Sequence, residues 1–171
     1  MAEPVPQDRL QPALLDRLTD DHPDQRREPA ERRSLSKARL RQAVLRDLAW
    51  LFNTVKLEAS ADLSGLSWVR RSVLNYGMAA LSGKTASTLD AVALTNVIRQ
   101  AILDFEPRIV PGTLQVRTVM EGGHLDHHNV IGVEIQGHLW AQPVPLELLV
   151  RTDIDIETGR VEIADLLPTR A

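Results

Sequence analysis

The chain contains no cysteine, so disulfide bonds, thiolate metal ligands and cysteine nucleophiles are all excluded. Aromatic residues make up only 4% of the sequence, which leaves few rings on which a sugar could stack. Long apolar runs are also missing. No stretch approaches the roughly 18 residues that a membrane span needs, and the N-terminus has no apolar signal core. We therefore expect a cytoplasmic protein with no membrane insertion.

Positive charge is not in excess either. The formal net charge is −3 and the isoelectric point is near 5.9, which argues against nucleic acid or an anionic membrane as the main partner. The 171 residues include 43% hydrophobic residues, enough for the core of one domain with some tail.

The first 36 residues hold five of the ten prolines and many charges, which predicts a mostly disordered leader over 1–36. One apolar island interrupts this leader. Leu14, Leu15 and Leu18 form a short amphipathic turn, and we interpret residues 12–20 as a candidate docking peptide. The remainder, 37–167, is expected to form a single α+β domain.

Helical periodicity predicts a first long helix over 37–55, with an apolar arc on one side. Its opposite face carries Arg46 and Trp50, four residues apart and close enough for a cation–π contact. An outward tryptophan beside arginine is typical of an interface anchor. The alternative is that Trp50 packs under the leader.

Two more helices are expected before the strands begin. Ser67 is a candidate cap for a short helix from Trp68 to about Tyr76. A third helix should start at Ser87 or Thr88 and end near Phe105, because Pro107 cannot continue it. Apolar residues cover most of the circumference of this third helix, so we expect it to be central and covered on several sides.

Strict alternation of apolar and polar residues then begins at Leu114 and recurs over 131–139 and 146–157, with a turn at 157–160 and a last short strand. This pattern predicts the α+β class, with N-terminal helices packed on one face of an antiparallel sheet of three to four strands.

The helix-to-sheet junction carries the most distinctive polar residues, Glu106 and Arg108 on either side of Pro107. Two positions apart in an extended segment, their side chains point to the same side. Two interpretations remain open. The pair either braces the junction as a local ion pair or meets charges on a partner, where it would set register.

The sequence gives little support for a metal site or for a catalytic site. His124, His127 and His128 lie on an expected hairpin loop, where nothing orients them, so we predict no metal site and no cofactor. A lysozyme-like hydrolase would need Glu106 as a general acid with a raised pKa. Arg108 favours the charged carboxylate and acts in the wrong direction. We therefore predict no catalytic residue.

Three ordered motifs resemble the TssE family of the type VI secretion system: RDLAWLFNT at 46–54, SVLNYG at 72–77 and FEPR at 105–108. The leader segment LLDRLTDD at 14–21 is also similar to that family, and the resemblance covers about residues 12–165. TssE proteins are related to the wedge protein of contractile-phage baseplates and, more distantly, to the anti-adaptor IraD.

The resemblance implies a structural baseplate protein that contacts the TssF and TssG wedge subunits, shares an assembly with TssK, and meets the TssB–TssC contractile sheath. It also implies that Glu106, Pro107 and Arg108 serve baseplate and sheath assembly. With the exposed features of the sequence, the expected partner-binding residues are Glu106, Pro107, Arg108, Arg46, Trp50, Leu14 and Leu15. Members of the family are often labelled lysozyme-like, which keeps a cell-wall hydrolase using Glu106 as the alternative.

Overall fold

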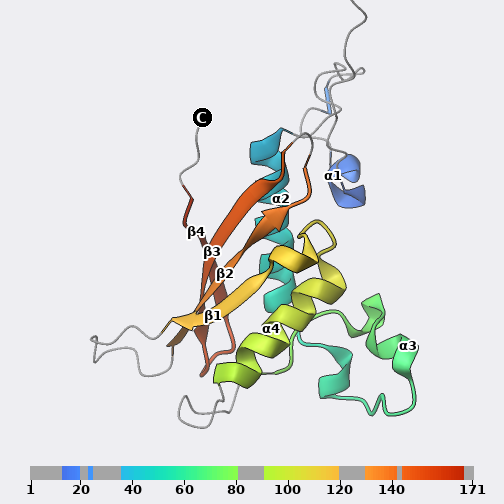
Figure 1. The fold of residues 1–171 in the computed structure, drawn as a ribbon. Helices are drawn as coiled ribbons and strands as arrows, with labels where there is room; N and C mark the ends of the chain where they lie inside the picture. The colour runs from blue at the N-terminus through green and yellow to red at the C-terminus, as the bar shows by residue number, and fades with distance from the viewer. Residues whose placement is uncertain are drawn as a thin grey trace, which may run out of the picture.

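The computed structural model describes residues 13–19, 23–24, 36–80, 91–119, 130–141 and 144–167. Helices come first along these residues and strands last, so the α+β class is confirmed (Figure 1). Most of the leader expected to be disordered, the histidine cluster at 124–128 and the expected helix start at 87–90 lie outside the described residues. No helix within those ranges is long and apolar enough to cross a membrane.

Helix α2 (Lys37–Phe52) is the first long element, as predicted. Its N-terminus is capped by Ser36, whose hydroxyl accepts a hydrogen bond from the Arg39 backbone N–H at 3.2 Å. The helix ends three residues before the predicted boundary. The Asn53 side chain instead makes two hydrogen bonds with the backbone of Val161 in the last strand, at 2.9 and 3.0 Å. A polar side chain therefore joins the end of α2 to the sheet.

Helix α4 (Ala91–Phe105) ends at Phe105, where Pro107 predicts the stop. The expectation that this helix is covered on several sides is wrong. Its buried residues form one stripe (Leu94, Ile98, Ala101 and Ile102), whereas Val92 and Val97 are exposed. Helix α4 is therefore not central. The sheet covers one of its faces, and apolar residues on the opposite face remain exposed.

The strands are β1 (Gln115–Val119), β2 (Val130–Leu139), β3 (Leu146–Asp155) and β4 (Val161–Asp165). Within the described ranges they form one antiparallel sheet in the order β1-β2-β3-β4, which confirms the predicted meander. The turn between β3 and β4 is closed by the Asp155 carboxylate, which accepts from the backbone N–H groups of Glu157 and Thr158.

The core lies between this sheet and the two long helices. Figure 1 shows α2 and α4 along the same side of the sheet, with α4 against β1 and α2 against β4. The alternation along the strands turns one set of side chains toward these helices. The sheet residues that are fully or nearly fully buried on that face include Val133, Ile135, Leu139, Leu148, Val150, Ile154 and Val161.

Residues 56–78 leave the core between α2 and α4, and we call them the excursion. It contains the short helices η2 (Leu57–Ala59), α3 (Ser67–Arg70) and η3 (Val73–Asn75). The predicted single helix from Trp68 to Tyr76 is therefore wrong, and Ser67 lies inside α3 rather than at its cap. Ser72 divides the segment, since its hydroxyl donates to the Val69 carbonyl and accepts from the Leu74 N–H.

The two ends of the excursion are joined to each other. Met78 N–H donates to the Thr54 carbonyl at 2.7 Å, and Lys56 N–H donates to the Met78 carbonyl at 2.9 Å. Gly77 makes this close approach feasible, since it has a φ of +121° and a Cβ there would lie 2.3 Å from the Thr54 oxygen. The excursion is thus a closed loop with a fixed base.

Candidate functional site

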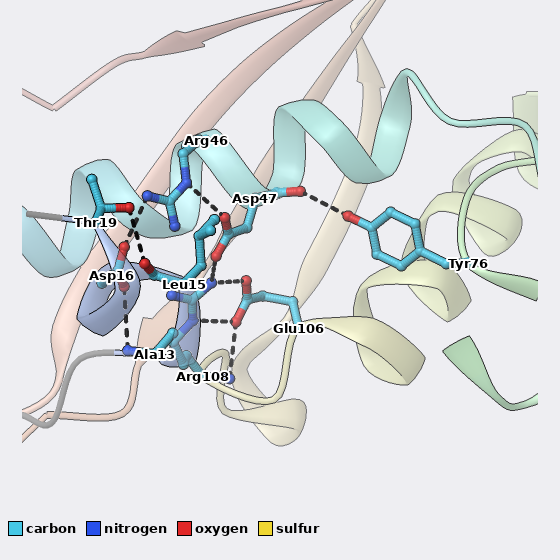
Figure 2. A network of polar contacts seen from close by, with 9 residues as sticks. All are labelled: Ala13, Leu15, Asp16, Thr19, Arg46, Asp47, Tyr76, Glu106 and Arg108. Carbon is cyan, nitrogen blue, oxygen red and sulfur yellow. Dashed lines mark hydrogen bonds and ion pairs between the residues drawn. The ribbon is translucent and has the colours of Figure 1, made fainter. Parts of the chain in front are cut away.

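An ion-pair network, here called the polar knot, joins Glu106, Arg108 and Asp47 (Figure 2). Arg108 Nε donates to Glu106 Oε1 at 2.7 Å, and Arg108 Nη2 donates both to Glu106 Oε2 and to Asp47 Oδ2 at 2.5 Å. The guanidinium group therefore holds Glu106 with two parallel hydrogen bonds and reaches α2 with a third. The prediction that Glu106 and Arg108 point to the same side is confirmed.

The backbone around Pro107 fixes this geometry. Glu106 N–H still donates to the Ile102 carbonyl of α4, and the Arg108 N–H turns back to Glu106 Oε1 at 3.1 Å. The Arg108 carbonyl accepts the N–H of Trp140, just after β2, at 2.7 Å. The knot therefore lies where α4, α2 and the end of β2 meet.

The knot continues toward the leader. Asp47 also pairs with its neighbour Arg46 at 2.9 Å, and Arg46 Nη1 pairs with Asp16 at 2.8 Å. Asp16 belongs to helix α1 (Leu14–Leu18), so charges of alternating sign run from the leader to Glu106. Figure 2 shows this chain of contacts from Asp16 through Arg46 and Asp47 to Arg108.

Burial differs along this chain. The Glu106 side chain is only 4% exposed, whereas those of Arg108 and Asp47 are 21% and 23% exposed. Burial by itself lowers the pKa of Arg108, but the hydrogen bonds and charges of Glu106 and Asp47 outweigh it and raise that pKa above its ordinary value. The Asp47 carboxylate likewise raises the pKa of Arg46, with a smaller contribution from Asp16. Both arginines therefore carry full charge at any physiological pH.

The three sequence motifs meet at the knot. Asp47 comes from the first motif and Arg108 from the third. Tyr76 of the second donates its hydroxyl to the Asp47 carbonyl at 3.3 Å and meets Phe105 edge-to-face, with ring centroids 5.2 Å apart. Segments about thirty residues apart in the sequence thus converge on one point of the fold.

The remaining predicted partner-binding residues lie around the knot. Arg46 stacks over Trp50 at 5.2 Å from the ring centroid, which confirms the predicted cation–π contact, and Trp50 is 51% exposed. Pro107 is exposed as well. In α1, Leu14 is well exposed and Leu15 is partly exposed, so the helix is tied to α2 through Asp16 and not through buried leucines.

Sequence reasoning missed three members of this site. Asp16 and Asp47 complete the charge network, and exposed Trp140 adjoins it through the Arg108 carbonyl. Asp47 directly follows Arg46 in the helix, and a search for acidic residues next to the exposed basic residues of this helix would have found it. Trp140 reaches the junction through the position of the end of β2 in the fold. The local sequence around Trp140 gives no sign of this.

Both carboxyl oxygens of Glu106 accept hydrogen bonds from Arg108, and Glu106 does not line the hollow of about 400 Å³ beside the excursion. Among the described residues, no group of three or more His, Asp or Glu side chains is arranged to hold a metal ion.

The chain belongs to a family of structural baseplate proteins. That family is the baseplate wedge protein gp25 family, whose model matches residues 38–144, more than half of the chain. The match confirms the resemblance to TssE, which carries this domain, and supports a structural role with other baseplate components as partners. No curated protein and no solved structure matches the chain significantly.

Proposed function

We propose that this protein is a structural, non-catalytic component of a type VI secretion baseplate. In this proposal it resides in the cytoplasm, docks on the TssF and TssG wedge subunits beside TssK, and nucleates the TssB–TssC sheath. The observation that carries the proposal is the convergence of the three motifs on the polar knot. The gp25 family match supports the baseplate role, and the motifs supply the assignment to type VI secretion.

The knot divides into an inner brace and an outer surface. Glu106 is buried and orients Arg108 through two hydrogen bonds. Arg108 and Asp47 keep part of their surface open, and Trp50, Pro107 and Trp140 are exposed around them. Exposed tryptophans around oriented charges are the composition of protein interfaces, where aromatic anchors supply affinity and charges set register. Partner subunits therefore meet the rim and Arg108, while Glu106 holds Arg108 in position.

The leader extends the same surface. Asp16 holds α1 on Arg46, and Leu14 is exposed to solvent. A short helix held by its acid and displaying a leucine fits the docking peptide proposed for residues 12–20. In this proposal α1 and the domain of residues 37–167 present one continuous interface to the wedge.

The first experiment changes the exposed tryptophans around the knot and leaves Glu106 and Arg108 intact. We expect the double variant Trp50→Ala, Trp140→Ala to melt close to the wild type, because both side chains are exposed. It should recover much less TssF–TssG in pull-downs. Arg117→Ala, on the polar face of the sheet, is the matched control. Full recruitment of wedge subunits by the double variant would overturn the proposal.

A second experiment separates the two interpretations of Glu106 and Arg108. Exchanging the two residues is unsuitable, because a carboxylate at position 108 would face Asp47. Arg108→Lys keeps the positive charge but loses the planar guanidinium group, which donates hydrogen bonds to Glu106 and Asp47 at the same time. We expect a folded variant that fails to recruit wedge or sheath subunits at temperatures well below its melting point. If the variant loses assembly only in proportion to its loss of folded protein, the Glu106–Arg108 pair stabilises the fold and does not contact a partner.

The hydrolase alternative has a direct test. Purified protein should not clear peptidoglycan, since Glu106 is buried and both of its carboxyl oxygens are hydrogen-bonded to Arg108. Clearing that disappears in Glu106→Gln would establish the enzyme instead.

A further inference from the structure

The ion pair between α1 and α2 uses only part of what its arginine offers. Asp16 Oδ1 pairs with Arg46 Nη1 at 2.8 Å, while Asp16 Oδ2 accepts from the Ala13 backbone N–H at 3.2 Å (Figure 2). The second carboxylate oxygen is therefore engaged within the leader. A guanidinium group binds a carboxylate most strongly through two parallel hydrogen bonds. Asp16 makes one such contact with Arg46.

The guanidinium group of Arg46 consequently keeps one nitrogen without an acceptor. Its Nε pairs with Asp47 at 2.9 Å and its Nη1 with Asp16, but its Nη2 is buried and has no hydrogen-bond partner among the described residues. Arg108 Nη1, in the same network, is buried and unpaired in the same way. A buried donor without an acceptor is unfavourable, so a carboxylate that reaches both Nη1 and Nη2 of Arg46 is a better ligand than Asp16.

Helix α1 has little apolar packing to keep it in this position. None of its five residues is buried, and Leu14 and Leu18 are 73% and 74% exposed. A helix this short is not stable in water without tertiary contacts, and a partly exposed ion pair contributes little to stability. Helix α1 is therefore displaceable by a group that competes for Arg46.

Arg46 stays oriented when Asp16 leaves. Its Nε remains paired with Asp47, and its guanidinium group lies over the ring of Trp50, 5.2 Å from the centroid. The charge balance also allows the exchange. With Asp16, the network holds three carboxylates and two guanidinium groups, and without Asp16 it holds two of each. Loss of Asp16 therefore leaves a preformed and neutral network with one edge of Arg46 open.

We propose that Asp16 is an internal substitute for a carboxylate of the partner, and that an acidic side chain of a wedge subunit displaces it from Arg46 during assembly. The incoming carboxylate pairs with Nη1 and Nη2 of Arg46 together, and α1 is released to dock its exposed leucines on the same partner. A carboxylate suits the position because a carboxylate already occupies it. The proposal rests on the proposed function, and it specifies the ligand of Arg46 and the state of α1 before assembly.

The first test removes the charge of the internal substitute. Asp16→Asn keeps the shape of the side chain and an oxygen for the Ala13 N–H, but it loses the charge that holds Arg46. Purified full-length protein is titrated with TssF–TssG complex. We expect about threefold to tenfold tighter binding, because the partner no longer competes with Asp16. Glu162→Gln removes one exposed negative charge from β4 and is the matched control, with unchanged binding. Equal or weaker binding by Asp16→Asn overturns the proposal.

The gain must also depend on Arg46. We expect Arg46→Gln to weaken binding, and the addition of Asp16→Asn to that variant to give no further gain. Arg46→Lys serves the same purpose if Arg46→Gln does not fold, because lysine cannot bind two carboxylate oxygens in parallel. The same gain from Asp16→Asn with and without Arg46 would mean that general charge is responsible, and would overturn the proposal.

A distance measurement separates this proposal from the proposed function. The chain has no cysteine, so spin labels can be attached through Thr19→Cys beside α1 and Glu162→Cys on β4, both at exposed positions. We expect one narrow distance distribution in the free protein, and a broad or shifted distribution in the Asp16→Asn variant and after TssF–TssG is added. An unchanged distribution in either case overturns the displacement of α1. If TssF–TssG still binds, the proposed function stands. Absence of binding by the wild type would overturn both.

Discussion

The polar knot and the excursion differ in how they place their side chains: the knot partly buries charged groups, and the excursion exposes apolar ones. The knot puts charges in a partly buried place and pairs each with an opposite charge, and two of these pairs, Arg108 with Asp47 and Arg46 with Asp16, join different elements. The excursion puts apolar groups in water and leaves them uncovered, although its own backbone is well braced. The knot therefore matters to the fold before any partner arrives, whereas the apolar face of the excursion gains its value only when something covers it.

The largest effect should come from removing the centre of the knot. Arg108→Ala leaves Glu106 buried without its counter-charge, which costs about 3–5 kcal/mol of unfolding free energy. Urea denaturation measures this loss. The matched change in the excursion is Arg71→Ala, which should stay within about 0.5 kcal/mol of the wild type. Equal effects at the two arginines would remove the contrast.

The base of the excursion is the next most sensitive place. Gly77→Ala introduces a Cβ into contact with the Thr54 backbone and forces a side chain onto a φ of +121°. Strain and displacement together should cost about 2–4 kcal/mol.

Gly65→Ala is the control for this change. Gly65 also has a positive φ, of +85°, but a Cβ there meets nothing within 4 Å. We expect a loss of about 1 kcal/mol, from conformation alone. If the two alanine variants melt together, close packing at the base of the excursion is not what holds it.

The same contrast shows what could be predicted from the sequence. Local rules were sufficient for the stop at Phe105, the side shared by Glu106 and Arg108, and the alternating strands. They failed for α4, because apolar periodicity cannot say whether a second layer covers the outer face. They failed for Asp47 and Trp140 as well, since only the fold brings α2 and the end of β2 to Arg108.

A smaller effect links the two regions through Tyr76. Burial raises the pKa of the Tyr76 phenol, and the charges of Asp47 and Glu106 raise it further. A group whose pKa is raised on folding contributes stability that is complete below its unfolded pKa, about 10, and lost as the pH rises through the folded value. Tyr76→Phe should cost about 0.5–1.5 kcal/mol near neutrality through the lost hydrogen bond to Asp47. The variant should also lose less stability than the wild type above pH 10, as followed by urea denaturation across the alkaline range. A parallel decline of both proteins would contradict this role.

The smallest effect on folding is expected at the most exposed residue. Trp68→Ser removes a large apolar group that has almost no contact with the rest of the fold, so its unfolding free energy should stay within about 0.5 kcal/mol of the wild type. A core change, Leu48→Ala, provides the scale, because that fully buried side chain should cost about 2–5 kcal/mol. Trp68→Ser should also reduce self-association at high concentration, measured by sedimentation velocity, since an exposed apolar patch drives non-specific contact. A clear loss of stability in Trp68→Ser would mean that Trp68 packs against the fold after all, and the apolar face of the excursion would then belong to the core and not to a partner.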